Sequence, residues 1–315
     1  MKNTLEKKSS NEAKMKTCIL AAAQGYTPEN IVPWVESLKK SGYRGEAIVI
    51  VYNPINTDLQ DYLKSQKIGV MEAIHKDHLN IATQRFWDFA TIMEGDLGKK
   101  YDYVITVDIR DVIFQKDPDK WVRENIGDKE IIASGEGIKY KHEDWNGDML
   151  QKHYGDNVFE IMKNHETLCS GIIAGKKGSM IKLLKTISEL CYYGVDPGDF
   201  VDQCYYNVAI RKIFNEKTKI AGGDSDWCAN LGTLYAIPMN TPEWSTGSKS
   251  QYLQKQRFRT HKKFTEAMLC DLPKMINGEV CNSKGKPYAI VHQYDRYLPW
   301  KNELIAKLSP SNFVS

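Results

Sequence analysis

Tyr101 to Pro118 reads Y-D-Y-V-I-T-V-D-I-R-D-V-I-F-Q-K-D-P, and this stretch decides the fold that we expect. Its apolar run at 104–107 predicts a strand that is covered on both faces, as in a parallel sheet. Asp108 and Asp111 come directly after the strand, at the carboxyl end where open α/β sheets bind ligands. Two carboxylates at this spacing suit a Mg²⁺ or Mn²⁺ site. An ordinary surface turn, with Arg110 paired to a neighbouring aspartate, explains the spacing equally well.

Strands and helices alternate on the amino-terminal side of this stretch. The hydrophobic pattern and the helix-capping residues predict strands at 18–23, 47–52 and 69–74, and helices from Pro28 to about Gly42, at 58–66 and from Asn80 to about Gly95. Such alternation is typical of a doubly wound α/β fold, in which the two acids follow the fourth strand. We therefore expect an α/β protein whose sheet is Rossmann-type, mixed but mainly parallel, and flanked by helices in a single domain.

The second half of the chain is less regular. The apolar pattern predicts strands at 131–134, 170–175 and 289–292, helices at 181–191 and 200–214, and a polar loop at 135–156. A basic stretch at 244–263, interleaved with aromatic residues, suits either a solvated surface or a lid over a diphosphate.

Composition places the chain among ordinary soluble globular proteins. It has 315 residues, of which 42% are hydrophobic, and a net charge of +3; this allows a sizeable core and does not favour nucleic-acid binding. Its seven cysteines are scattered and include no C-x-x-C pair, so we expect reduced thiols in a cytoplasmic protein. No apolar run reaches the ~20 residues of a membrane span, which leaves only peripheral membrane contact open.

In order and spacing, these features resemble the metal-dependent glycosyltransferases of the GT-A fold, in particular the glycogenin-like and lipopolysaccharide-galactosyltransferase-like group. In that group a strand ends in Asp-x-Asp, an apolar run and Asp-Pro, and the counterpart here is V-D-I-R-D-V-I-F with Asp117-Pro118 behind it. Counting back from Asp117 puts Asp111 on the motif's last acid, the usual metal ligand. Asp108 stands one residue earlier than the motif's first acid.

The resemblance covers residues 17–300 and implies a division of the chain. A nucleotide-binding half is expected at 17–118 and an acceptor-binding half at 119–300. The polar, lysine-rich residues 1–16 are expected to form a disordered tail, and residues 301–315 a carboxyl-terminal extension.

A histidine far along the chain is expected to complete the metal site. His292 lies in V-H-Q-Y-D-R-Y-L-P-W, which is similar to the group's late histidine and Pro-Trp segment. With Asp111 and Asp108 it would make the ligand set, and a neutral imidazole suits Mn²⁺ better than Mg²⁺. A hydrogen-bonded structural histidine is the alternative.

Further positions are implied for the donor, a nucleotide-diphosphate sugar. Arg85 matches a basic residue near the donor's ribose and pyrophosphate, although a surface ion pair explains it as well. Ser170 and Gly171 resemble the strand under the donor sugar. The residues expected to face the base and ribose, at the end of the first strand, are Ala22, Ala23, Gln24 and Tyr26.

The acceptor side is implied by Asp202-Gln203, which resembles an Asp-Gln pair that opens a helix beside the acceptor. A carboxylate there could bind a sugar hydroxyl or act as general base, and favourable helix-dipole charge is the alternative. Asp199, just upstream, is the second candidate for the base. The acceptor itself is expected to be a glycan, a lipid-linked molecule or a protein.

The expected activity is therefore that of a metal-dependent glycosyltransferase, with a hexose as the sugar moved. A sugar nucleotidyltransferase would instead carry a Gly-rich loop with a basic residue after its first strand, and residues 21–26 lack both features. A haloacid-dehalogenase-like phosphatase would need an acid where Arg110 stands. A sugar-binding module that has lost catalysis remains the non-enzymatic alternative.

Overall fold

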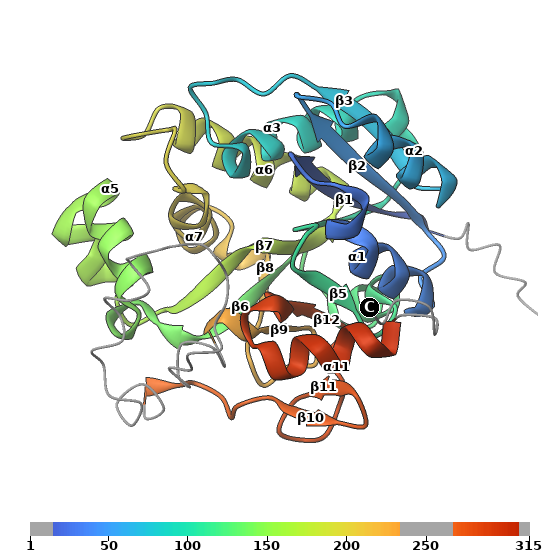
Figure 1. Cartoon of the computed structure of the whole chain (residues 1–315). Coiled ribbons are helices and arrows are strands. Elements are labelled where there is room, and N and C mark those ends of the chain that lie inside the picture. The colour runs from blue at the N-terminus through green and yellow to red at the C-terminus, as the bar shows by residue number, and fades with distance from the viewer. Residues whose placement is uncertain (1–14, 234–266, 309–315) are drawn as a thin grey trace, which may run out of the picture.

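The apolar runs predicted as strands meet in one seven-stranded sheet in this computed structural model, which describes residues 15–233 and 267–308 (Figure 1). The strands are, in spatial order, β3 (Gly69–Ala73), β2 (Glu46–Tyr52), β1 (Thr17–Gln24), β4 (Tyr103–Val107), β7 (Glu166–Lys176), β6 (Ile131–Lys139) and β8 (Thr218–Ala221). Only β7 is antiparallel to its neighbours β4 and β6; the other pairs are parallel. The predicted mixed, mainly parallel sheet is confirmed.

Helices cover both faces of the sheet. The described part of the chain contains eight α-helices: α1 (Pro28–Lys40), α2 (Thr57–Ser65), α3 (Ile81–Glu94), α4 (Pro118–Asn125), α5 (Asp144–Met162), α6 (Lys177–Tyr192), α7 (Asp202–Lys212) and α11 (Leu298–Leu308). One apolar core joins α1, α2 and α4 to one face, and a second joins α3, α6 and α7 to the other (Figure 1). Short 3-10 helices lie at Asp96–Lys100, Tyr140–His142, Asn215–Lys217 and Tyr294–Arg296.

Two smaller sheets lie beside the main one. The first has the order β5 (Val112–Phe114), β12 (Ile290–His292) and β9 (Cys228–Asn230), and the second is the hairpin β10 (Lys274–Ile276) and β11 (Glu279–Cys281). In the first, His292 pairs with Val112 across an antiparallel ladder. This register places β12 against β5, which follows the turn after β4.

Local sequence signals explain where the helices begin. Thr27 and Asn30 form a capping box before α1, with Pro28 as its first residue. Asp117 caps α4 by accepting a hydrogen bond from the Asp119 N–H at 3.0 Å, again with a proline next. The Asp117-Pro118 pair that located Asp111 in the sequence is therefore a helix start.

The region 135–156 differs from its prediction as a polar loop. Strand β6 continues to Lys139 and α5 begins at Asp144. The glycines at 135 and 137 interrupt the sequence pattern of the strand. They lie where the register between β6 and β7 shifts. Gly155 has φ 77° and ψ 173° inside α5 and divides it into two helical pieces, which weakens the helical pattern.

Other predicted segments fall close to their observed limits. The strand predicted at 170–175 spans 166–176, and the helix predicted at 200–214 spans 202–212. Helix α11 crosses residue 300, the expected end of the domain, and buries Trp300 and Leu304 against the smaller sheets. Most of the expected tail, residues 1–14, and the basic stretch 244–263 lie outside the described residues. In the ranges that are described, no helix has the length and apolarity to cross a bilayer.

Candidate metal centre

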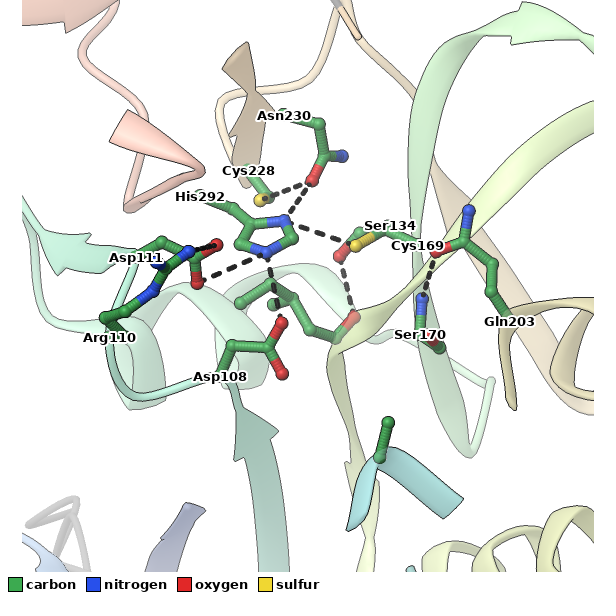
Figure 2. A network of polar contacts seen from close by, with 12 residues as sticks. Asp108, Arg110, Asp111, Ser134, Cys169, Ser170, Gln203, Cys228, Asn230 and His292 are labelled. Atoms are coloured by element: carbon green, nitrogen blue, oxygen red, sulfur yellow. Dashed lines mark hydrogen bonds and ion pairs between the residues drawn. The ribbon is translucent and has the colours of Figure 1, made fainter. Parts of the chain in front are cut away.

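Three predicted ligands converge where β4 ends. Asp108 and Asp111 lie on the turn after this strand, and the Asp108 N–H donates to the Gly171 carbonyl of β7 at 2.9 Å. His292 reaches them from the last position of β12. Figure 2 shows the carboxylates of Asp108 and Asp111 on one side of the imidazole ring and Asn230 on the other.

Distances within this group suit a metal ion. The Nε2 atom of His292 is 3.2 Å from Asp108 Oδ2 and 3.8 Å from Asp111 Oδ1. One ligand atom from each residue lies within 4.8 Å of the others. Two carboxylate oxygens and one imidazole nitrogen form a donor set of the kind that binds Mn²⁺ and related divalent cations. These three residues, which we call the Asp-Asp-His group, could therefore hold a metal ion.

Asn230 fixes the orientation of the imidazole. Its Nδ2 donates to the Gly135 carbonyl at 3.0 Å, so its Oδ1 faces His292 Nδ1, 2.8 Å away. Nδ1 must then carry hydrogen, which directs Nε2 toward the carboxylates. A hydrogen-bonded partner behind a ligating imidazole is the usual arrangement in metal sites.

The imidazole favours its charged form when no ion is bound. Burial lowers the pKa of His292, but Cys169 and the carboxylates of Asp108 and Asp111 outweigh burial and hold this pKa well above its ordinary value. Because a metal can bind Nε2 only after the proton leaves, metal binding should weaken as the pH falls.

Each carboxylate also faces an arginine with its second oxygen. Asp108 Oδ1 is paired with Arg85, and Asp111 Oδ2 lies 3.4 Å from Arg296 and 3.6 Å from Arg110. Burial opposes ionisation of Asp108, yet Arg85 and His292 lower its pKa below the ordinary value. Asp108 therefore stays charged at neutral pH, as a metal ligand must.

Arg85 joins the metal group to the predicted acceptor side. Its side chain is 12% exposed, pairs with Asp108, and lies 3.6 Å from Asp202 Oδ2. The guanidinium is held against α3 by a hydrogen bond from Nε to the Ala82 carbonyl at 3.1 Å. The alternative of a plain surface ion pair does not describe it, because the side chain is largely buried and lines the cavity.

The strand below the group, β7, must come very close to it. A Cβ on Gly171 would lie 2.6 Å from Asp108 Oδ2 and 3.0 Å from His292 Cε1, so only glycine fits. Ser170, the preceding residue, donates from Oγ to Asp202 Oδ2 at 2.7 Å, and its N–H donates to Gln203 Oε1 at 3.4 Å.

Most of the predicted site residues line one cavity of about 550 Å³, a volume typical of small-molecule sites. Two predicted residues lie elsewhere. Ala23 points into the core on the opposite side of β1, as strand alternation requires. Asp199 is exposed and lies 3.4 Å from Lys152. The predicted residues that line the cavity are Ala22, Gln24, Tyr26, Arg85, Asp108, Asp111, Ser170, Gly171, Asp202, Gln203 and His292.

Sequence reasoning missed another part of the cavity wall. Glu136, Glu143 and Asn146 line it together with Trp145 and Arg296. Glu143 caps α5 through the backbone N–H groups of Trp145 and Asn146, at 3.2 and 2.7 Å. A usable signal was the glutamate between two glycines at 135–137, because glycines inside a strand often mark a bulge beside a site.

Comparison with known proteins leaves the family open. No family model matches the chain, and no curated protein sequence is significantly similar to it. The chain is thus an α/β protein with a mixed seven-stranded sheet and an Asp-Asp-His group that could hold a metal ion.

Proposed function

We propose that this protein is a glycosyltransferase that moves a sugar from a nucleotide-diphosphate sugar to a hydroxyl group of a glycan, lipid-linked or protein acceptor. The observation that carries the proposal is the position of the Asp-Asp-His group. It opens into a cavity at the carboxyl ends of β1 and β4, together with Arg85 and the glycine of β7. Ligands of open α/β sheets bind at such strand ends.

The donor's nucleotide would lie along the β1 side of the cavity, next to Ala22, Gln24 and Tyr26. Mn²⁺ or Mg²⁺ bound by the Asp-Asp-His group would neutralise negative charge on the leaving diphosphate. Arg85 would add a fixed positive charge beside it, in a partly water-excluded place where charge is effective.

The sugar would lie over β7 and the start of α7. Gly171 gives room for a ring close to the strand, and Ser170, Asp202 and Gln203 offer oxygen and nitrogen atoms to its hydroxyl groups. Asp202 is held by Arg85 and Ser170, which suits a residue that orients a sugar. Asp199 is too far round the surface to line this cavity.

Nucleotide release tests the proposal. The protein is mixed with a panel of uridine, guanosine and adenosine diphosphate sugars, with and without Mn²⁺, and free nucleoside diphosphate is measured. We expect one donor to be turned over only when the metal is present. Binding of a nucleoside diphosphate and Mn²⁺ without any turnover would favour the sugar-binding module, and neither binding nor turnover would refute both.

Replacing Asp111 with alanine tests the site. Asp111→Ala removes one metal ligand and should reduce metal-dependent release by at least about 10²-fold, since the charge on the leaving group is no longer neutralised. Asp128→Ala is the matched control, because this aspartate is exposed and far from the cavity lining. Full activity of the Asp111 variant, measured beside that control, would contradict the assignment.

A further inference from the structure

One carboxylate in the cavity differs from the others in its partners. Among the residues that the structure describes, five carboxylates line the cavity: those of Asp108, Asp111, Glu136, Glu143 and Asp202. Asp108, Asp111 and Asp202 each lie within ion-pair distance of an arginine. Glu143 caps a helix. Glu136 alone, within residues 15–233 and 267–308, receives hydrogen bonds only from neutral side chains and forms no ion pair.

The backbone around Glu136 turns its side chain into the cavity. Ser134 and Gly135 pair with Cys169 and Leu168 of β7, and pairing with β7 then resumes only at Lys139. Gly137 has φ 72°, and a Cβ on Gly135 would lie 2.2 Å from Glu166 Oε1. The positive φ of Gly137 favours glycine, and Gly135 leaves room for the Glu166 side chain, so the two glycines favour a bulge here. Bulges re-aim side chains beside sites.

Two weak donors hold the carboxylate of Glu136. Gln203 Nε2 donates to Oε1 at 3.1 Å, and Thr233 Oγ1 donates to Oε2 at 3.3 Å. Gln203 also contacts the N–H of Ser170, the residue under the expected sugar position. A single side chain, Gln203, therefore connects Glu136 with Ser170, which lies at the expected sugar position.

Burial raises the pKa of Glu136 to about 7, and the nearby charge of Glu143 adds to the increase, while His292 and the two donors oppose it. A carboxylic acid that titrates near neutral pH can both accept and release a proton efficiently. The titratable groups that face it from the neighbouring elements are Glu143 at the start of α5, Cys169 on β7, Cys228 on β9, His292 on β12 and Tyr140.

We propose that Glu136 is the catalytic residue that takes the proton from the acceptor hydroxyl during sugar transfer. This inference rests on the proposed function. As the acceptor oxygen forms its bond to the anomeric carbon, its proton passes to a carboxylate oxygen of Glu136. The bond from that carbon to the diphosphate oxygen breaks, and its electron pair leaves with the nucleoside diphosphate. Glu136 then returns the proton to solvent.

Glu136 fits this role better than the two carboxylates that the sequence indicated. Burial raises the pKa of Asp202 too, but Arg85 and the Ser170 hydroxyl oppose this increase, and the Asp202 carboxylate is already engaged by both of them. Asp199 does not line the cavity. Glu136 is buried, lines the cavity and forms no ion pair with an arginine or lysine in the part of the chain that the structure describes, which is the setting of a proton acceptor.

The test compares the wild-type protein with Glu136→Gln and Glu166→Gln. Glutamine keeps the shape of position 136 and an oxygen that can accept from Gln203, and its N–H can donate to the Thr233 hydroxyl, but it cannot accept the proton. Glu166 is the matched control, because it is also a glutamate whose pKa burial raises, and it lies outside the cavity lining. Glu166 accepts the Gly137 N–H bond of the bulge, and glutamine keeps the oxygen that accepts it. The readouts are the rate of nucleoside diphosphate release with the best donor, its pH profile, and calorimetric binding of the nucleoside diphosphate with Mn²⁺.

We expect Glu136→Gln to lower kcat by about 10²- to 10⁴-fold with unchanged binding of the nucleoside diphosphate. The wild-type rate should rise with pH through an apparent pKa near 7, and this limb should be absent in Glu136→Gln and present in Glu166→Gln. If Glu136→Gln retains both the rate and the rise of the rate with pH, the proposed role of Glu136 is refuted, while the proposed glycosyltransferase function still stands. A wild-type protein that neither binds nor turns over any donor refutes the proposed function, and this inference with it.

Discussion

At the end of β4, Asp108 and Asp111 each face an arginine, whereas Glu136 on the β6 bulge faces only neutral donors in the same cavity. Arg85 and His292 keep the carboxylate of Asp108 charged. The carboxylate of Glu136 is driven toward its neutral form by burial. The comparison teaches that one cavity can hold carboxylates for two tasks, one that needs a permanent negative charge and one that needs an exchangeable proton.

The largest change in stability should come from removing Arg85, the cation that pairs with Asp108 and Asp202 on what we call the charged side of the cavity. Arg85→Met leaves the buried Asp202 without a cation and leaves Asp108 with His292 as its remaining charged partner. Breaking a buried pair from one side costs about 3–5 kcal/mol, and we expect the free energy of unfolding, measured in urea, to fall by an amount in this range.

Lys120→Met is the control for this variant. Lys120 also pairs with an acid, Glu124, but both side chains are exposed, at 71% and 61%. Its loss should cost no more than about 1 kcal/mol, as for surface pairs. Equal costs for the two variants would show that the charged side of the cavity is no different from an ordinary surface.

Replacing Glu136, on what we call the proton-exchanging side of the cavity, should increase the stability of the protein, whereas replacing Arg85 decreases it. Because the folded-state pKa of Glu136 is raised from 4.5 to about 7, the folded protein binds more protons than the unfolded chain between these values, and its stability falls as the pH rises through them. Glu136→Gln cannot titrate, so its stability should not show this fall with rising pH. The variant should equal the wild type near pH 4 and exceed it at pH 8 by on the order of 3 kcal/mol.

Denaturation at several pH values measures this difference directly. Other titrating groups change both proteins alike, so subtracting the two curves isolates Glu136. Asp128→Asn, at an exposed position, should give a flat difference. A flat difference for Glu136→Gln as well would show that Glu136 is charged in the folded protein at neutral pH.

The two sides also differ in how well the sequence predicted them. The apolar run 104–107 and the alternation before it gave the sheet, because fully buried strands carry a continuous pattern. Asp108 and Asp111 could be placed at a strand end by the same reasoning. Their approach to His292 could not, because it depends on pairing between strands of three residues each, which are too short to show a period.

Glu136 was missed for a different physical reason. A bulge needs residues that interrupt the strand pattern, so the feature that aims Glu136 into the cavity also made 135–156 read as a loop. Asn230 gave no signal either, since its role consists of a hydrogen bond to the ring of His292. Resemblance to a family supplied His292, and neither composition nor periodicity would have found it.

Asn230 connects the two sides, and its replacement should have the smallest effect. Asn230→Ala removes the oxygen that holds His292 Nδ1–H, and loss of such a partner typically weakens metal binding by about 10- to 100-fold. Asn230→Asp keeps an oxygen toward Nδ1 but loses the N–H that Asn230 donates to the Gly135 carbonyl. It should therefore retain the affinity for Mn²⁺, measured by calorimetry without nucleotide, if the bond to Nδ1 is what matters. Equal affinity in all three proteins would mean that His292 is oriented by its strand alone.

Asn230→Ala also tests whether the Asp-Asp-His group and Glu136 act independently of each other. Asn230 also donates to the Gly135 carbonyl, directly before Glu136, so its loss could loosen the bulge as well as the imidazole. If the sides are independent, Asn230→Ala at saturating Mn²⁺ should regain turnover with the apparent pKa near 7 unchanged. If the apparent pKa instead moves toward that of an ordinary glutamate, Asn230 helps to keep Glu136 buried. The Asp-Asp-His group and Glu136 would then belong to one hydrogen-bonded unit that sets both the charge of the carboxylates and the proton exchange of Glu136.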